Sequence, residues 1–137
     1  MTGFVIDASL AGAWLLPDES GDDAVAIGRR MLREGACAPA LFPQEVCNLL
    51  LMALRRGRMS DDAFWRQLAR VESLSVRIRS TGSTRRNAEL ALAHGLTAYD
   101  AAYLALALAE GLPLATLDRR LRAAAQAEGV PVLPEGP

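Results

Sequence analysis

The chain has 137 residues, of which 51% are hydrophobic and 23% charged, and its net charge is −1. This balance is typical of a globular domain with a sizeable core, and no apolar run approaches the roughly 18 residues of a membrane span. The N-terminus lacks the basic segment of a signal peptide, and Cys37 and Cys47 lack the pattern of a disulfide framework or zinc site. We therefore expect one domain over residues 1–137, located in the cytoplasm and without a membrane partner.

All 15 basic residues are arginine, and the chain contains no lysine. The missing lysine excludes P-loop nucleotide hydrolysis and Schiff-base chemistry. The guanidinium group of arginine suits forked contact with phosphate. The arginines also cluster in sequence, which fits either solvated helix ends or phosphate contacts. The clusters are Arg29-Arg30-Arg33, Arg55-Arg56-Arg58, Arg77-Arg79, Arg85-Arg86 and Arg119-Arg120-Arg122.

The first half of the chain alternates short apolar runs with helical patterns. Phe4–Ile6 is typical of a strand buried on both faces, and Ser9 can cap a short helix that closes at Pro17. The expected elements that follow are a helix opened by Ser20–Asp23 and ended by Gly35, a strand at Ala36–Ala38, a helix from about Pro43 to Arg56, and a helix capped by Ser60 that carries Phe64, Trp65, Leu68 and Val71.

The second half continues the alternation. Thr97 to Asp100 resembles a capping box, with Thr at the N-cap and an acid three residues later. The expected elements are a strand at Ser75–Ile78, a helix with Leu90 and Leu92 closed by Gly95, a helix from the capping box to Gly111, a strand at Leu114–Thr116, a helix from Asp118 to about Glu128, and an edge strand at Val130–Leu133. We expect Trp14, Trp65, Tyr99 and Tyr103 to pack in the core or an interface.

Short apolar strands that alternate with helices predict an α/β fold, with a parallel sheet of about four to five strands covered on both faces. In such sheets the ligand site lies beyond the C-terminal ends of the strands. Asp7 follows the first predicted strand and Asp118 follows the fourth. Both carboxylates are therefore expected at the edge of the sheet that carries the chemistry.

Two further acids stand near helix starts. Asp100 is either a capping-box acid and nothing more, or an acid that faces a polar cleft at the head of a strongly apolar helix. Glu45 precedes Asn48 by three residues, on the same face of an otherwise apolar helix. The pair indicates a polar pocket, although a first-turn Glu beside an exposed Asn is the alternative.

Several acids that converge in one cleft repel each other, so they need a cation or some of them must remain protonated. His94 is the only histidine, next to Gly95 at a predicted helix end, where a C-terminal cap is favoured over a general base. The ion is therefore expected to be hard and oxygen-loving, such as Mg²⁺ or Mn²⁺. Such an ion can activate water and neutralise phosphate charge. The four acids together predict metal-dependent cleavage of phosphodiesters.

Four blocks of the sequence, taken together, resemble a known family. In order and content they resemble PIN domains, and most closely the VapC-type toxins of bacterial and archaeal toxin–antitoxin pairs. The resemblance covers essentially the whole chain, and the third block is the most specific. The blocks are Val5-Ile6-Asp7-Ala8-Ser9, Glu45-Val46-Cys47-Asn48, Leu96-Thr97-Ala98-Tyr99-Asp100-Ala101-Ala102-Tyr103 and Leu114-Ala115-Thr116-Leu117-Asp118.

The resemblance implies a three-layer α/β/α sandwich with strand order 3-2-1-4-5. It also implies Mg²⁺- or Mn²⁺-dependent endoribonuclease activity, a homodimer, and inhibition by a VapB-type antitoxin. In that interpretation the metal is held, directly or through water, by Asp7, Glu45, Asp100 and Asp118. The same resemblance gives Ser9 and Thr116 as hydroxyls that orient carboxylates or bind water, and Asn48 as a polar neighbour.

One departure from the family bears on the number of metal ions. Some relatives carry an additional acid or Asn near the fourth block, whereas Arg119 and Arg120 follow Asp118 here. The resemblance therefore does not decide whether the site holds one metal ion or two.

Other functions fit the sequence less well. A phosphoacceptor domain would need a lysine, and a haloacid-dehalogenase-type phosphatase would need Asp where Ser9 stands. The remaining alternative is a catalytically weak or inactive PIN-like binding module that acts through protein partners. Such a relative would be expected to have lost one of the four acids, and all four are present.

Overall fold

Five short strands form one sheet in the order β3-β2-β1-β4-β5, and every neighbouring pair is parallel. This computed structural model describes residues 3–16, 21–80 and 83–136. The parallel sheet and its strand order confirm the predicted fold class. The strands are β1 (Phe4–Ile6), β2 (Ala36–Ala38), β3 (Val76–Ile78), β4 (Leu114–Ala115) and β5 (Val132–Leu133).

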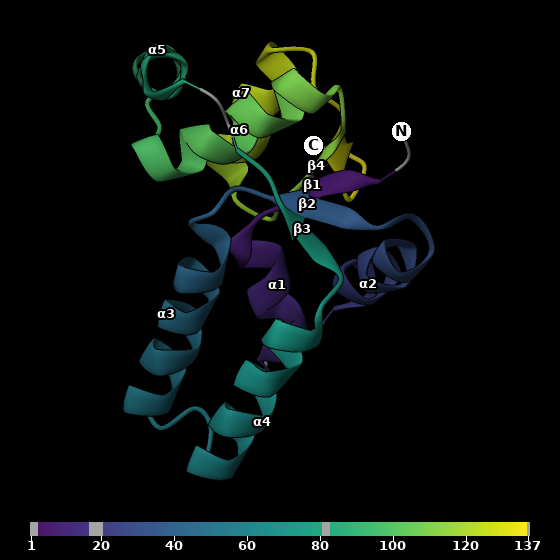
Figure 1. The fold of residues 1–137 in the computed structure, drawn as a ribbon, viewed down its shortest axis with the longest axis vertical. Coiled ribbons are helices and arrows are strands. Elements are labelled where there is room, and N and C mark those ends of the chain that lie inside the picture. The colour runs from purple at the N-terminus through teal and green to yellow at the C-terminus, as the bar shows by residue number, and fades with distance from the viewer. Residues whose placement is uncertain (1–2, 17–20, 81–82, 137) are drawn as a thin grey trace.

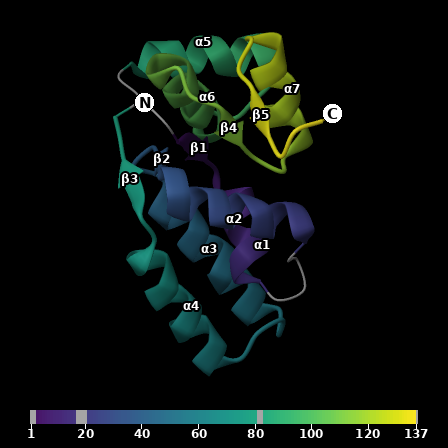
Figure 2. The same ribbon diagram turned by 90° about the vertical axis from the view of Figure 1, so that its right-hand side faces the viewer.

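The helices cover both faces of the sheet and complete the predicted sandwich (Figure 1). On one side lie α1 (Ala8–Leu15), α2 (Asp22–Glu34), α3 (Phe42–Arg55) and α4 (Asp61–Ser73). On the other side lie α5 (Thr84–His94), α6 (Ala98–Glu110) and α7 (Arg119–Ala127). Figure 2 shows the same layers from the side, with α3 and α4 reaching away from the sheet.

Local capping explains where most helices begin and end. The side chains of Ser60, Ser83 and Thr97 accept hydrogen bonds from backbone amides in the first turns of α4, α5 and α6. Gly95 and Gly111 end α5 and α6 in the left-handed conformation that glycine adopts without strain. The main caps predicted from the sequence are thus in place.

The predicted cap of α1 is wrong. Its N-cap is Asp7, whose carboxylate accepts a hydrogen bond from Leu10 N, and Ser9 already lies inside the helix. Either residue type can cap a helix. Asp7 takes the position because the helix follows β1 without a loop. Pro17, expected to close this helix, lies outside the described residues.

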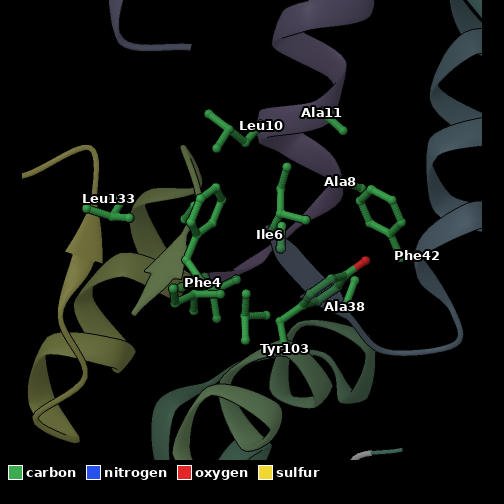
Figure 3. Close-up of a cluster of buried hydrophobic side chains, with 14 of the residues drawn as sticks. Phe4, Ile6, Ala8, Leu10, Ala11, Ala38, Phe42, Tyr103 and Leu133 are labelled. Carbon is green, nitrogen blue, oxygen red and sulfur yellow. The ribbon is translucent and has the colours of Figure 1, made fainter. Parts of the chain in front are cut away.

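The core lies between the sheet and the helices on each side (Figure 3). All residues of β1 and β2 are buried, as is the stretch 101–107 of α6. Alanine provides much of this stretch, and small side chains let α6 approach β1 and β4 closely. This tight packing fixes the position of the first turn of α6 relative to the ends of those strands.

Several apolar side chains that we expected to pack are exposed instead. Trp65 and Tyr99 are each 65% exposed and so do not belong to the core, which leaves an interface as the remaining prediction for them, and Leu92 is 87% exposed. Trp14 is half-buried, and its indole N–H donates to Ala24 O. In the described part of the chain, no helix is both long and apolar enough to cross a membrane.

Arg122 shows that the last arginine cluster is not simply a solvated helix face. Its buried guanidinium donates to the carbonyl oxygens of Thr116 at 2.9 Å, Pro134 at 2.7 Å and Gly136 at 2.9 Å. It thereby joins the end of β4 to the segment after β5. A buried cation is tolerated here because several acceptors replace its water.

We expect Arg122→Met to lower the free energy of unfolding by about 2 to 4 kcal/mol, because buried carbonyls lose a charged donor. Urea unfolding followed by circular dichroism measures the change. Arg119→Met, at an exposed position of the same helix, is the control and should change stability by less than about 0.5 kcal/mol. Equal effects of the two substitutions would contradict the role assigned to Arg122.

Candidate active site

The four predicted acids line one pocket of about 240 Å³. They come from four separate segments. Asp7 follows β1, Glu45 lies in the first turn of α3, Asp100 lies in the first turn of α6, and Asp118 is the N-cap of α7. The structure therefore brings the whole set together at the C-terminal edge of the sheet. The pocket is also lined by Ala8, Ser9, Asn48, Leu49 and Tyr103.

Asp7 is the most buried of the four, with 4% of its surface exposed. Its Oδ1 accepts hydrogen bonds from Ser9 Oγ at 2.7 Å and from Leu10 N at 3.1 Å. Its Oδ2 accepts a short bond from Thr116 Oγ1. The two hydroxyls and one amide therefore fix the orientation of the carboxylate.

Thr116 links Asp7 to Asp118. Besides donating to Asp7, its Oγ1 accepts from Asp118 N at 3.0 Å. Ser9 Oγ lies 3.4 Å from Thr116 Oγ1 and accepts from Leu117 N at 3.1 Å. The two hydroxyls thus tie the end of β1 to the segment that follows β4. Both hydroxyls donate to the Asp7 carboxylate, and the orienting role that the resemblance to PIN domains implies for them stays a prediction.

Glu45 and Asp100 are held by different means. Tyr103 Oη donates to Glu45 Oε1 at 2.6 Å, which connects α6 to α3 across the pocket. Asp100 N donates to Thr97 Oγ1 at 3.1 Å, so the backbone half of the predicted capping box is formed. The carboxyl group of Asp100 nevertheless lines the pocket. Asp100 thus takes part in the cap of α6 and also lines the pocket, and its role in a metal site stays a prediction.

Burial and the neighbouring acids raise the pKa values of three of the carboxyl groups. Burial raises the pKa of Asp7 to about 6, against the lowering effect of its hydrogen bonds to Thr116, Ser9 and Leu10. Burial also raises the pKa of Glu45, and the neighbouring charge of Asp100 adds to that rise. The pKa of Asp100 is raised by burial and then by Asp118. Asp100 is thus coupled to each of the other three acids.

Comparison with known proteins agrees with this arrangement. The sequence model described as the PIN domain matches residues 4–127. The chain belongs to the PIN domain family. A relative from Pyrobaculum aerophilum named Ribonuclease VapC3 is 34% identical over 120 residues, covering 85% of this chain and 90% of the relative.

Two further likenesses support the assignment. Ribonuclease VapC12 of Mycobacterium tuberculosis is 36% identical over 118 residues, covering 85% of this chain and 88% of the relative. The crystal structure of PAE2754 from Pyrobaculum aerophilum superposes with a TM-score of 0.75 at 27% identity, covering 96% of this chain and 90% of that chain. The PIN-like architecture expected from the sequence is therefore shown both by sequence and by fold.

The donor set of this PIN domain suits a hard cation, because four of the nine residues that line the pocket are carboxylates. However, among the described residues no group of three His, Cys, Asp or Glu side chains is arranged so that it could hold a metal ion as it stands. Several of the acids already use a carboxylate oxygen for a protein hydrogen bond. Mg²⁺ commonly keeps several waters and takes only one or two carboxylates directly, which is compatible with such a set.

The remaining predicted residues have mixed outcomes. Asn48 lines the pocket but is exposed, and its amide contacts Met52 Sδ at 3.7 Å. Tyr103 was expected only to pack, yet it contributes a hydroxyl to the site. Its spacing of three residues from Asp100, on the same helical face, is the sequence signal that could have identified it. His94 is the last residue of α5. Its Nε2 lies 2.7 Å from Glu128 Oε2, and it does not line the pocket of the four acids.

The raised pKa of Asp7 predicts how the metal-free protein responds to pH. A group whose pKa is higher in the folded state than its ordinary value of 3.8 stabilises the fold at low pH, and this contribution is lost as pH rises through about 6. In EDTA we expect the stability of Asp7→Asn relative to wild type to rise by about 1 to 1.5 kcal/mol between pH 5 and pH 7.5, because only the interval from pH 5 to about 6 contributes.

Urea unfolding at the two pH values measures this difference, with Glu72→Gln on the exposed side of α4 as the control. A stability difference between wild type and Asp7→Asn that does not change with pH would show that Asp7 has an ordinary pKa in the folded protein.

Proposed function

We propose that this PIN domain is a Mg²⁺- or Mn²⁺-dependent endoribonuclease and the toxin of a VapBC-type pair. The observation that carries the proposal is the pocket lined by Asp7, Glu45, Asp100 and Asp118. Curated relatives at 34% and 36% identity are named as ribonucleases of the VapC type, which supports RNA as the substrate. No other function considered for the sequence uses all four acids.

The four carboxylates would hold the ion directly or through water. When bound, a divalent ion supplies charge neutralisation at the phosphate and activation of water. Burial is the main cause of the raised pKa values of Asp7, Glu45 and Asp100, and repulsion from a neighbouring acid adds to each of them, so a cation would relieve part of the cost. One ion or two can satisfy the same donors.

The other residues of the chain would keep the carboxylates in position. Ser9 and Thr116 orient Asp7, so that its oxygens do not turn away from the pocket. Tyr103 restrains Glu45 in the same way. Asp7 has a pKa of about 6, so it is mainly charged at pH 7.5 and ready to meet a cation. These residues reduce the reorganisation that binding would otherwise require.

Cleavage of structured RNAs by the purified chain tests the activity. We expect cleavage with Mg²⁺ or Mn²⁺ and none in EDTA. Asp7→Asn and Asp100→Asn should each reduce the rate by at least about 100-fold, since even residues that only orient metal ligands cost 10- to 100-fold. Glu72→Gln is the control. A wild type that never cleaves, or variants that cut equally well, would favour an inactive binding module instead.

Thr116 offers a test of the orienting hydroxyls. Thr116→Val keeps the buried shape but removes the hydrogen bond to Asp7. We expect cleavage or the apparent affinity for Mg²⁺ to fall by about 10- to 100-fold. Thr116→Ser keeps the hydroxyl and should retain most activity. Initial rates measured over a Mg²⁺ titration separate the two effects, and an active valine variant would refute the orienting role.

We also propose that the chain forms a homodimer and is inhibited by a small VapB-type antitoxin. The antitoxin follows from the VapC-type names of the relatives, and the homodimer from the resemblance of the sequence to VapC-type toxins. The molecular mass of the purified chain at micromolar concentration, alone and with a candidate antitoxin, tests both assemblies. A mass of one chain under both conditions would count against them.

A further inference from the structure

A second cavity adjoins the acid pocket. It has a volume of about 420 Å³, and Asp100 and Asp118 line both hollows. The other residues lining it are Gly95, Leu96, Thr97, Arg119 and Arg120. The shared wall means that a chain-like molecule seated over the acids can continue directly into this second hollow. Two arginines would meet it there.

The two arginines stand where a helix does not favour cations. Arg119 and Arg120 are the first residues of α7, at the positive end of its dipole. Helices α2 and α4 instead begin with pairs of aspartates, the usual arrangement. The position of the arginines is therefore unfavourable for the helix itself. It is favourable for an anion that enters the neighbouring cavity.

The arginines are also kept apart from the acids beside them. Arg120 Nη1 donates to Gly95 O at 3.3 Å, and Arg120 lowers the pKa of Asp100 without forming an ion pair with it. Both arginine side chains are exposed. Guanidinium groups that are not neutralised by a carboxylate remain available to phosphate, which they bind in forked geometry.

We propose that this second cavity is a subsite for the RNA backbone, in which Arg119 and Arg120 bind a phosphate next to the one that is cleaved. The inference rests on the proposed ribonuclease function and adds the direction in which the strand leaves the acids. It also gives the net negative chain a local attraction for its polyanionic substrate. The contact reads the backbone and not the base sequence.

Binding of a fluorescently labelled single-stranded RNA to full-length Asp7→Asn protein tests the subsite without cleavage. Fluorescence anisotropy is measured between 50 and 300 mM salt for this parent and for Arg119→Gln and Arg120→Gln added to it. We expect each substitution to weaken binding by about 3- to 10-fold at low salt and to reduce the slope of log K against log salt by about 1. Arg66→Gln, an exposed arginine on α4, should change neither quantity.

The outcomes separate the subsite from the activity. If the parent binds RNA and the two subsite variants bind with the same affinity and slope, the subsite is wrong while the ribonuclease stands. The arginines would then be available to an acidic protein segment instead. If the parent binds no RNA and wild type cleaves none, both proposals fail. Within the part of the chain that the structure describes, the Arg119 side chain makes no hydrogen bond. Its variant therefore remains informative even if Arg120→Gln disturbs the contact with Gly95.

Discussion

The buried carboxylate of Asp7 is the constraint on which the rest of the site depends. It caps α1, accepts the Ser9 hydroxyl, and receives the Thr116 hydroxyl from the segment after β4. One side chain thereby starts a helix and fixes two strand ends relative to each other. Three hydrogen bonds do not fully replace water around the charge, because the pKa is still raised to about 6. The remaining cost is what a bound cation would relieve.

Much of the fold was predictable because local sequence patterns determine its helices and strands. Strands buried on both faces appear as short, continuous apolar runs, and Phe4–Ile6 and Ala36–Ala38 were recognisable for that reason. The strand-end rule then placed Asp7 and Asp118 at one edge of the sheet. The order of the strands could not be predicted from local patterns, because strand pairing joins residues that are far apart in sequence. It came from the resemblance to PIN domains and not from the pattern of residues.

The errors arose where a long-range contact decides between local alternatives. Ser9 and Asp7 can both cap a helix, and the choice reflects a network that reaches Thr116, 107 residues beyond Ser9. Arg122 resembled its exposed neighbours in sequence, yet it is buried among carbonyls from the C-terminal segment. Tyr99 and Tyr103 are one turn apart on an apolar helix, but one is 65% exposed and the other 1%. The apolar pattern of the helix does not separate the two tyrosines, and only the spacing of Tyr103 from Asp100 distinguishes it.

The site also has to satisfy two opposite electrostatic demands. For the proposed function the acids must gather to attract a cation, yet the proposed RNA substrate is a polyanion that the same acids repel. The chain separates the two demands in space, with Asp7 as the most buried acid of the pocket and Arg119 and Arg120 exposed in the adjoining cavity. Direct ion pairs between these arginines and the acids would cancel both attractions. Arg120 instead donates to a backbone carbonyl, which carries no net charge. This contact holds Arg120 near Asp100 and neutralises neither of the two side chains.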